Sequence, residues 1–290
     1  MKLAWKFNLV LLAIFVAGFL IAGLASHRVL QSNAREEILQ HARLMMEAAL
    51  ASRAYTNSQV KPLLETQLKY TFLPQTVPAY AATEVFNDLR KKHPDYGYKE
   101  ATLNPTNPRD RANDWEADIV HTFRQSPTLG EMVGERDTPN GRALYLARPI
   151  QIQSAACLVC HSTVEAAPRT MVDLYGNANG FGWQMNEVIG AQVVSVPMSL
   201  PIARANATFR TFMVSLAAVF LAAFVLLNVM LYTMVIRRVT RLAGVADQVS
   251  LGNFEAGEFK SSSRDEIGVL TEALARMKTS LVQAMKMLEA

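Results

Sequence analysis

Two long runs of apolar residues dominate the hydropathy pattern of the chain. The first extends from Phe7 to Ala25 and is interrupted only by Asn8. The second covers residues 212–236 and contains no charged side chain. At about 1.5 Å per helical residue, each run can cross a bilayer core of ~30 Å. The pattern therefore predicts transmembrane helices at residues 1–25 and 211–236, with residues 26–210 between them.

The charges that flank the two runs predict the topology. Lys2 and Lys6 lie at the start of the first run, and three arginines follow the second run within residues 237–241. The positive-inside rule then places both termini in the cytoplasm of a bacterial cell, with both spans in the inner membrane and residues 26–210 in the periplasm. A signal peptide cleaved near Ala25 is the alternative for the first run; its length favours a retained anchor.

Helical spacing continues beyond the first run. Residues 29–55 carry apolar positions three to four residues apart and contain no Gly or Pro, so the first helix is expected to extend outward from the membrane. Prolines then divide residues 57–141 into shorter elements. Within this stretch, residues 83–92 and 110–124 have the pattern of amphipathic helices.

The sequence predicts β-strands on both sides of residue 140 and another one at residues 189–196. Asn140-Gly141 predicts a hairpin between strands at residues 130–136 and 142–150. The valine-rich residues 189–196 predict a buried strand. The central region is therefore expected to have an α+β fold, a small antiparallel sheet with helices over one face.

The last section shows the most regular pattern. A heptad seam of alternating three- and four-residue steps is predicted from Ile267, Leu270, Leu274, Met277, Leu281, Ala284 and Leu288. A shorter seam covers residues 239–249, and a connector over residues 251–264 separates the two. Two narrow seams cannot bury each other within one chain, so a dimeric four-helix bundle is expected. A helical tail without a signalling role is the alternative.

The composition of the chain and the motifs that it lacks limit the classes of function to be considered. Half of the residues are hydrophobic and 19% are charged, in agreement with two membrane spans. The net charge of +4 includes no dense block of Lys and Arg, which excludes nucleic-acid binding. No nucleophile elbow, phosphate loop or supported carboxylate pair occurs, so we expect a chain without a catalytic module. Asp114 and Glu116 flank Trp115 and are expected to fix a loop or lie at the surface.

The two cysteines of the chain belong to one motif, since residues 157–161 read Cys-Leu-Val-Cys-His. This spacing is typical of c-type haem attachment, in which two thiols bond to the porphyrin and the histidine ligates iron. A thioredoxin-type pair, a small disulfide ring and a zinc site are the alternatives, each poorly supported by its surroundings. The sequence predicts one covalent haem c per chain, bound by Cys157, Cys160 and His161, with His161 as proximal iron ligand.

Spacing leaves the second axial position of the iron open. His121 lies on the predicted helix over residues 110–124 and is the best histidine for it. Methionines compete with it, since thioether ligation would raise the potential; they are Met132, Met171 and Met185. Tyrosine, water or an empty position are further alternatives. The other histidines are His27, which is too near the membrane exit, His41 and His93. Met45 and Met46 are expected to be packing residues.

Residues 237–288 resemble the HAMP linker of bacterial membrane receptors. The matching features are Gly252-x-Phe254, the later Phe259 and Asp265-Glu266-Ile267-Gly268-x-Leu270 at the start of the second helix. The resemblance implies a dimeric signalling unit over residues 237–290. One departure is that the first helix of such linkers commonly begins with proline, whereas Val239 and its neighbours stand at that place here.

Residues 40–200 resemble a family of periplasmic c-type-haem domains with a PAS-like fold, found in membrane-bound sensors. The resemblance is carried by residues 77–82 (VPAYAA), 98–105 (YKEATLNP), 112–116 (ANDWE), 157–161, 180–183 (GFGW) and 194–198 (VSVPM). It implies a haem held covalently on a PAS-like sheet and a sensory role.

These features together predict a dimeric haem receptor in the membrane. A redox change or a diatomic gas at the iron is expected to be sensed in the periplasm, and the signal to pass through the HAMP unit. The expected partners are a second copy of the chain, membrane lipid, and a cytoplasmic kinase, cyclase or chemotaxis-type protein. The alternative is a membrane-anchored c-type cytochrome that transfers electrons and uses its helical tail only to dimerise.

Overall fold

The computed structural model describes residues 3–255, 257–260 and 264–288. The chain divides into two compact units, one of residues 27–208 and one of residues 1–26 together with 209–290. Two long helices, α1 (Leu3–Tyr55) and α8 (Ser199–Met230), each begin in one unit and end in the other. Lys2, one of the two lysines used to predict the topology, lies outside the described residues.

The unit of residues 27–208 is built on a four-stranded antiparallel sheet. Its strands are β1 (Gly97–Thr102), β2 (Met132–Thr138), β3 (Gly141–Gln151) and β4 (Val188–Pro197). They lie in the order β1-β4-β3-β2, and each neighbouring pair is antiparallel. The predicted α+β class, the hairpin and the valine-rich strand are confirmed. Strand β1 was not predicted, because the adjacent charged residues Lys99 and Glu100 interrupt any alternation of apolar and polar positions along it.

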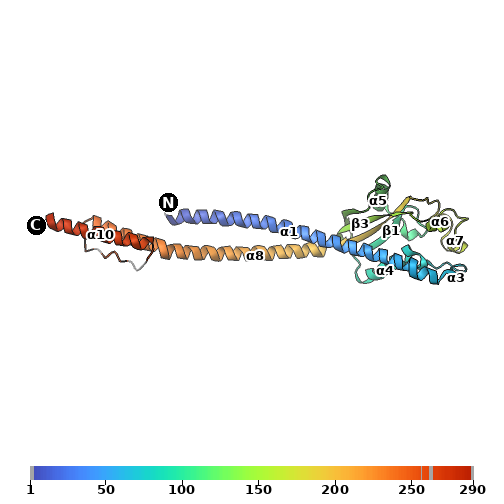
Figure 1. Cartoon of the computed structure of the whole chain (residues 1–290), viewed down its shortest axis with the longest axis horizontal. Coiled ribbons are helices and arrows are strands. Elements are labelled where there is room, and N and C mark those ends of the chain that lie inside the picture. Colours follow the sequence, from blue (N-terminus) through green and yellow to red (C-terminus); the bar gives the residue numbers. More distant parts are fainter. Residues whose placement is uncertain (1–2, 256, 261–263, 289–290) are drawn as a thin grey trace. The chain divides into compact units, whose positions relative to one another are not determined.

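One face of the sheet is covered by α1 and by α4 (Pro78–Lys92), as Figure 1 shows. Ile38, Ala42 and Met46 of α1 are completely buried there, against Val194 and Val196 of β4. Burial of each large aliphatic side chain stabilises the fold by roughly 1.5–3 kcal/mol. The predicted continuation of the first helix through residues 29–55 is confirmed, and Met46 is a packing residue.

The other face of the sheet is covered by α5 (Asp114–Gln125), which corrects the expectation of helices over one face only. Ile119, Val120 and Phe123 of α5 pack against this face. The helix begins with a capping box, in which the Asn113 and Glu116 side chains each bond the other's backbone N–H. Glu116 also pairs with Lys99 at 2.7 Å, so it fixes the start of the helix.

Short helices complete this unit. A π-helix, η1 (Thr56–Val60), continues directly from α1 and leads into α2 (Lys61–Leu63) and α3 (Glu65–Leu68). The 3-10 turns are η2 (Pro74–Thr76) and η3 (Pro108–Asp110). Two further helices, α6 (Ala155–His161) and α7 (Arg169–Tyr175), lie between β3 and β4 in the sequence. Figure 1 shows α6, α7 and α3 at the same end of this unit.

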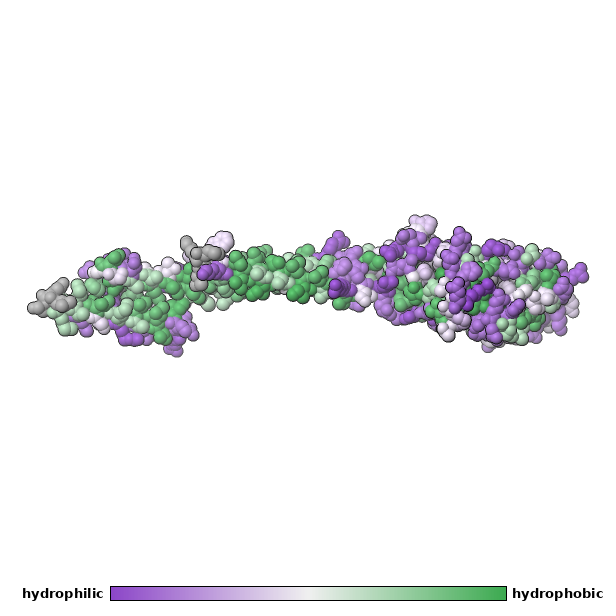
Figure 2. Space-filling view, turned by 90° about the horizontal axis from the view of Figure 1, so that it is seen from above, coloured by the Kyte–Doolittle hydropathy of each residue, from purple (hydrophilic) through white to green (hydrophobic). Residues whose placement is uncertain are grey.

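The second unit contains the two apolar runs. The first half of α1 and the middle of α8 lie side by side, with the Phe15 and Phe220 rings stacked at 4.9 Å. Gly18 lies against the Phe220 ring. Both helices are long and apolar enough to cross a membrane by length and composition. Most of their large apolar side chains are exposed, and Figure 2 shows them as a continuous hydrophobic surface.

Beyond the apolar run, a π-helix, η4 (Leu231–Ile236), joins α8 to α9 (Arg237–Ser250). The second helix of this section is α10 (Glu266–Leu288). Leu242, Val249 and Phe259 form a small core to which Ile267 and Leu274 of α10 contribute. Both predicted helices are present, whereas residues 256 and 261–263 of the predicted connector and the side chain of Leu288 lie outside the described residues.

Candidate functional site

The Cys-x-x-Cys-His motif lies on α6. The Ser154 side chain caps this helix by accepting a hydrogen bond from the Ala156 N–H at 3.2 Å. Cys157 and Cys160 are three residues apart on the helix, so their side chains point to the same side. Both thiols are half-buried and unbridged by a disulfide. Burial raises the pKa of Cys160, although Lys61 opposes the shift.

The His161 imidazole is held by a backbone carbonyl. Its Nδ1 lies 2.8 Å from the Gly180 carbonyl oxygen, and because that oxygen can only accept, Nδ1 carries the proton. Burial lowers the pKa of His161, while the bond to Gly180 raises it more weakly. The ring is therefore neutral near pH 7, with its Nε2 lone pair available. Metal-ligating histidines are oriented in this way, by a hydrogen bond from the second ring nitrogen.

A second contact fixes the plane of the imidazole. The Trp183 ring stacks on His161 at 3.9 Å between centroids, with 19° between the planes. The Trp183 backbone N–H also donates to the His161 carbonyl at 3.2 Å, and the Gly182 backbone N–H donates to the Ser162 carbonyl at 2.9 Å. Residues 180–183 therefore bind both the ring and the backbone at the end of α6.

Any residue other than glycine at position 180 would displace Thr106. Its φ of +86° is rare for L residues, and a Cβ there would lie 2.0 Å from the Thr106 Oγ1 and 2.8 Å from the Thr106 Cα. Asn104 holds the same loop from the other side, accepting from the Gly180 N–H and donating to the Phe181 carbonyl, each at 3.2 Å. The loop after β1, with Asn104 and Thr106, and the loop before β4, with residues 180–183, thus hold His161 between them; we call these residues the His161 clamp.

Sequence reasoning missed the parts of this clamp. Thr106, whose Oγ1 is 3.4 Å from the His161 Nδ1, had no predicted role. Residues 104 and 180–183 were noticed as parts of a family resemblance, and Asn179-Gly180 also as a second Asn-Gly sequence in the chain. The available sequence signal was the turn composition of Asn179-Gly180 and Gly182, and in the structure both glycines have the positive φ that such turns require.

The four residues predicted as second axial ligands lie on separate elements. His121 is exposed on α5, and Met132 on β2 packs within the cluster on the α5 face. Met171 is buried on α7, and Met185, in the segment before β4, is 44% exposed. The hydrogen-bond and ring partners of the His161 side chain within the described residues are Thr106, Gly180 and Trp183, so the role of these four side chains stays a prediction. The other histidines, His27, His41 and His93, are exposed.

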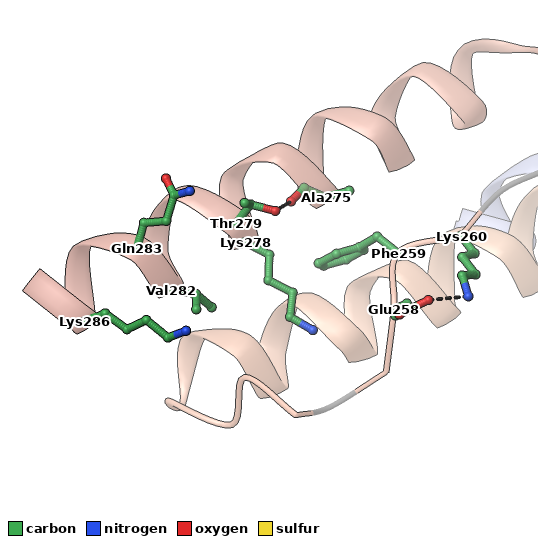
Figure 3. A pocket seen from close by; sticks show the side chains of 9 residues that line it. All are labelled: Glu258, Phe259, Lys260, Ala275, Lys278, Thr279, Val282, Gln283 and Lys286. Carbon is green, nitrogen blue, oxygen red and sulfur yellow. Dashed lines mark hydrogen bonds and ion pairs between the residues drawn. The ribbon is translucent and has the colours of Figure 1, made fainter.

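Across residues 3–255, 257–260 and 264–288, no group of three or more His, Cys, Asp or Glu side chains could hold a metal ion. A pocket of about 520 Å³ lies in the other unit, between the connector and α10. Figure 3 shows its lining, in which Phe259, Ala275 and Val282 supply apolar surface and three lysines surround it. These lysines are Lys260, Lys278 and Lys286.

Residues 31–197 match the family described as Tll0287-like. No curated protein matches the chain. Among solved structures, the crystal structure of the cyanobacterial haem protein Tll0287 is similar with a TM-score of 0.44 and 16% identity. That similarity covers 56% of this chain and 95% of the other.

Proposed function

Because the chain belongs to the Tll0287-like family, we propose that residues 27–208 carry one covalently bound haem c. The observation that carries this proposal is the protonated Nδ1 of His161 on the Gly180 carbonyl, which leaves Nε2 to ligate iron. Tll0287, after which the family is named, is described as a haem protein.

The residues of α6 fit a covalently attached haem. The unbridged thiols of Cys157 and Cys160 lie on one side of the helix, as attachment to the two vinyl groups of one porphyrin requires. Each thiol adds across a vinyl double bond: sulfur bonds to one carbon and the hydrogen passes to the other. When bound, haem supplies an iron that takes up or releases one electron and that can accept a sixth ligand.

A spectrum tests this proposal. The full chain should be produced in a host that matures c-type cytochromes and purified in detergent. We expect a pyridine haemochrome spectrum of about one haem per chain, retained after denaturation. Replacement of both Cys157 and Cys160 by Ala should abolish covalent retention, whereas Ala156→Ser, on the same helix, should retain it. Colourless wild-type protein contradicts the proposal.

We further propose that this domain is the sensory part of a membrane receptor. Two features support it: α1 passes without interruption from the apolar run onto the sheet, and α8 begins two residues after β4 ends. A change in the sheet would therefore reach both helices through direct chain connection. In this proposal the domain is PAS-like and periplasmic, both spans lie in the inner membrane, and residues 237–290 act as a HAMP unit.

The exposed seam of α10 supports a dimer. Leu270, Met277 and Leu281 are 42–48% exposed although they occupy predicted seam positions. A second copy of the chain would cover these side chains and complete a four-helix bundle. The lysine-rich groove of Figure 3 would then lie beside that bundle, accessible to a kinase, cyclase or chemotaxis-type partner.

Electron transfer is the alternative function, and the exposure of α6 favours it. Val159, between the two cysteines, is 60% exposed, so a haem edge there would be open to a redox partner. Redox titration with and without CO distinguishes the two. A fast reversible couple without CO binding favours the carrier, and ligand-linked changes favour the receptor.

A further inference from the structure

Helices α1 and α8 face each other along two stripes of half-buried residues, within the unit of residues 1–26 and 209–290. Each stripe has the three- and four-residue steps of one helix face. On α1 it consists of Asn8, Leu11, Phe15, Phe19 and Ala22, and on α8 of Met213, Leu216, Phe220, Phe224 and Asn228. The other members are apolar, so each stripe carries one amide.

Contacts between the stripes define an antiparallel register. The Phe15 and Phe220 rings stack with centroids 4.9 Å apart, and a Cβ at Gly23 would lie 3.1 Å from the Met213 Cε. A step of eight residues along α1 therefore matches a step of seven residues in the opposite direction along α8. The same register can be followed the other way, toward the start of α1.

In this register the two amides lie at the same level of the helix pair. Asn8 comes seven residues before Phe15, and Asn228 comes eight residues after Phe220, so the two levels differ by less than one helical turn. Both residues belong to the facing stripes. Each asparagine is therefore directed toward the helix that carries the other.

The hydrogen bonds of the two amides are complementary. The Asn8 Oδ1 is buried and has no hydrogen-bond partner among the described residues. Asn228 donates through Nδ2 to the Phe224 carbonyl at 2.9 Å. That bond takes one of the two amide hydrogens, and the second can serve another acceptor. An acceptor that needs a donor thus lies at the level of a donor with a second hydrogen.

A membrane would make this pairing strongly favourable. Lipid tails cannot donate a hydrogen bond, so a buried amide oxygen without a partner is costly there. Apolar contacts such as that of Phe15 with Phe220 compete with lipid that is equally apolar, whereas a hydrogen bond between helices has no competitor in lipid. The amides are therefore the groups best able to fix one arrangement of the two helices.

We propose that Asn8 and Asn228 form an intramembrane amide pair, in which the second Nδ2 hydrogen of Asn228 bonds the Asn8 Oδ1. The inference rests on the proposed membrane receptor. Asn228 comes three residues before η4 begins, so the pair holds α8 against α1 just before the π-helix. Movement of α8 relative to α1 at this level must break the bond. The two asparagines are thus positioning residues for the section that follows α8.

A disulfide measures how firmly the amide pair holds the two helices. Ala4→Cys and Leu231→Cys place thiols at half-buried positions about one turn beyond the asparagines. Haem attachment consumes the native thiols, so the full chain in membranes then carries two free cysteines. Equilibration with glutathione gives their effective concentration. Asn8→Leu and Asn228→Leu should each lower it about three- to tenfold, and together no further than either alone.

Two matched variants separate the pair from the composition of the helices. Asn8→Leu/Leu9→Asn keeps the composition but moves the amide to a position that is 57% exposed, and it should behave like Asn8→Leu. Thr233→Val removes a hydroxyl that bonds the Val229 carbonyl of its own helix at 2.8 Å, and it should stay within about twofold of wild type. The inference is wrong if Asn8→Leu acts but Asn228→Leu does not, if their effects multiply, or if neither exceeds Thr233→Val. Failure of the wild-type chain to fractionate with membranes contradicts the proposed receptor instead.

Discussion

At the scale of single residues, the candidate site depends on two glycines with different constraints. Gly180 and Gly182 both have positive φ, of +86° and +79°. A Cβ at Gly182 would meet no atom within 4 Å, whereas one at Gly180 would collide with the Thr106 backbone and side chain. Substitution of Gly182 therefore measures the free-energy cost of positive φ alone, whereas substitution of Gly180 adds the cost of the collision with Thr106.

We expect Gly182→Ala to lower the free energy of unfolding by roughly 1–2 kcal/mol, the cost of a left-handed L residue. Gly180→Ala should cost more, because the loop must also move away from Thr106, and His161 then loses its carbonyl partner. Thermal unfolding measures the stabilities, and the fraction of chains with attached haem measures the effect on the site. Equal losses in the two variants would show that the close approach does not matter.

Asp110 predicts a pH dependence of stability. Burial raises its pKa to about 6, against partial compensation by Arg109. Because the folded state holds this proton more tightly than the unfolded chain, the associated stability is full below pH 4 and is lost as the pH rises to 6. Asp110→Asn should therefore stabilise the protein at pH 8 by at most ~3 kcal/mol, and much less at pH 4. Unfolding curves of both proteins at these two pH values provide the measurement, and an equal effect at both would contradict it.

At the scale of elements, the sequence predicted what depends on local pattern. The apolar stripe of α1, the Asn140-Gly141 hairpin and strand β4 follow from spacing and turn chemistry alone. Strand β1 could not be predicted, because the charge of the buried Glu100 is paired with Arg53, 47 positions earlier in the chain. The clamp on His161 has the same origin, since it joins Thr106 to Gly180 across a long separation.

The stripe of α1 gives a prediction about packing. Met46→Ala removes a fully buried side chain between α1 and the sheet and should lower the free energy of unfolding by roughly 2–5 kcal/mol. Leu44→Ala, on the same helix, is the control because Leu44 is 70% exposed and its loss should cost less than about 0.5 kcal/mol. Denaturant titration measures the free energy of unfolding of both variants. Similar losses would mean that α1 does not pack on the sheet as described.

At the scale of the whole molecule, the proposed dimer can be tested with thiols, since both native cysteines would be consumed by haem attachment. Leu270→Cys introduces a thiol on the expected seam of α10, and Val269→Cys introduces one beside it that is 66% exposed. Oxidation in membranes should cross-link the Leu270 variant efficiently and the Val269 variant poorly. Gel mobility without reductant measures the yield, and equal yields would count against the seam.

The π-helix η4 (Leu231–Ile236) has a mechanical consequence for the section that follows it. A π turn holds about one residue more than an α turn, so rewinding it by one residue would swivel every later side chain by about 100° around the helix axis. Leu242 and Val249, which now point into the small core of α9 and α10, would then point elsewhere. A short underwound stretch can thus let the following helix rotate about its axis without a shift along that axis.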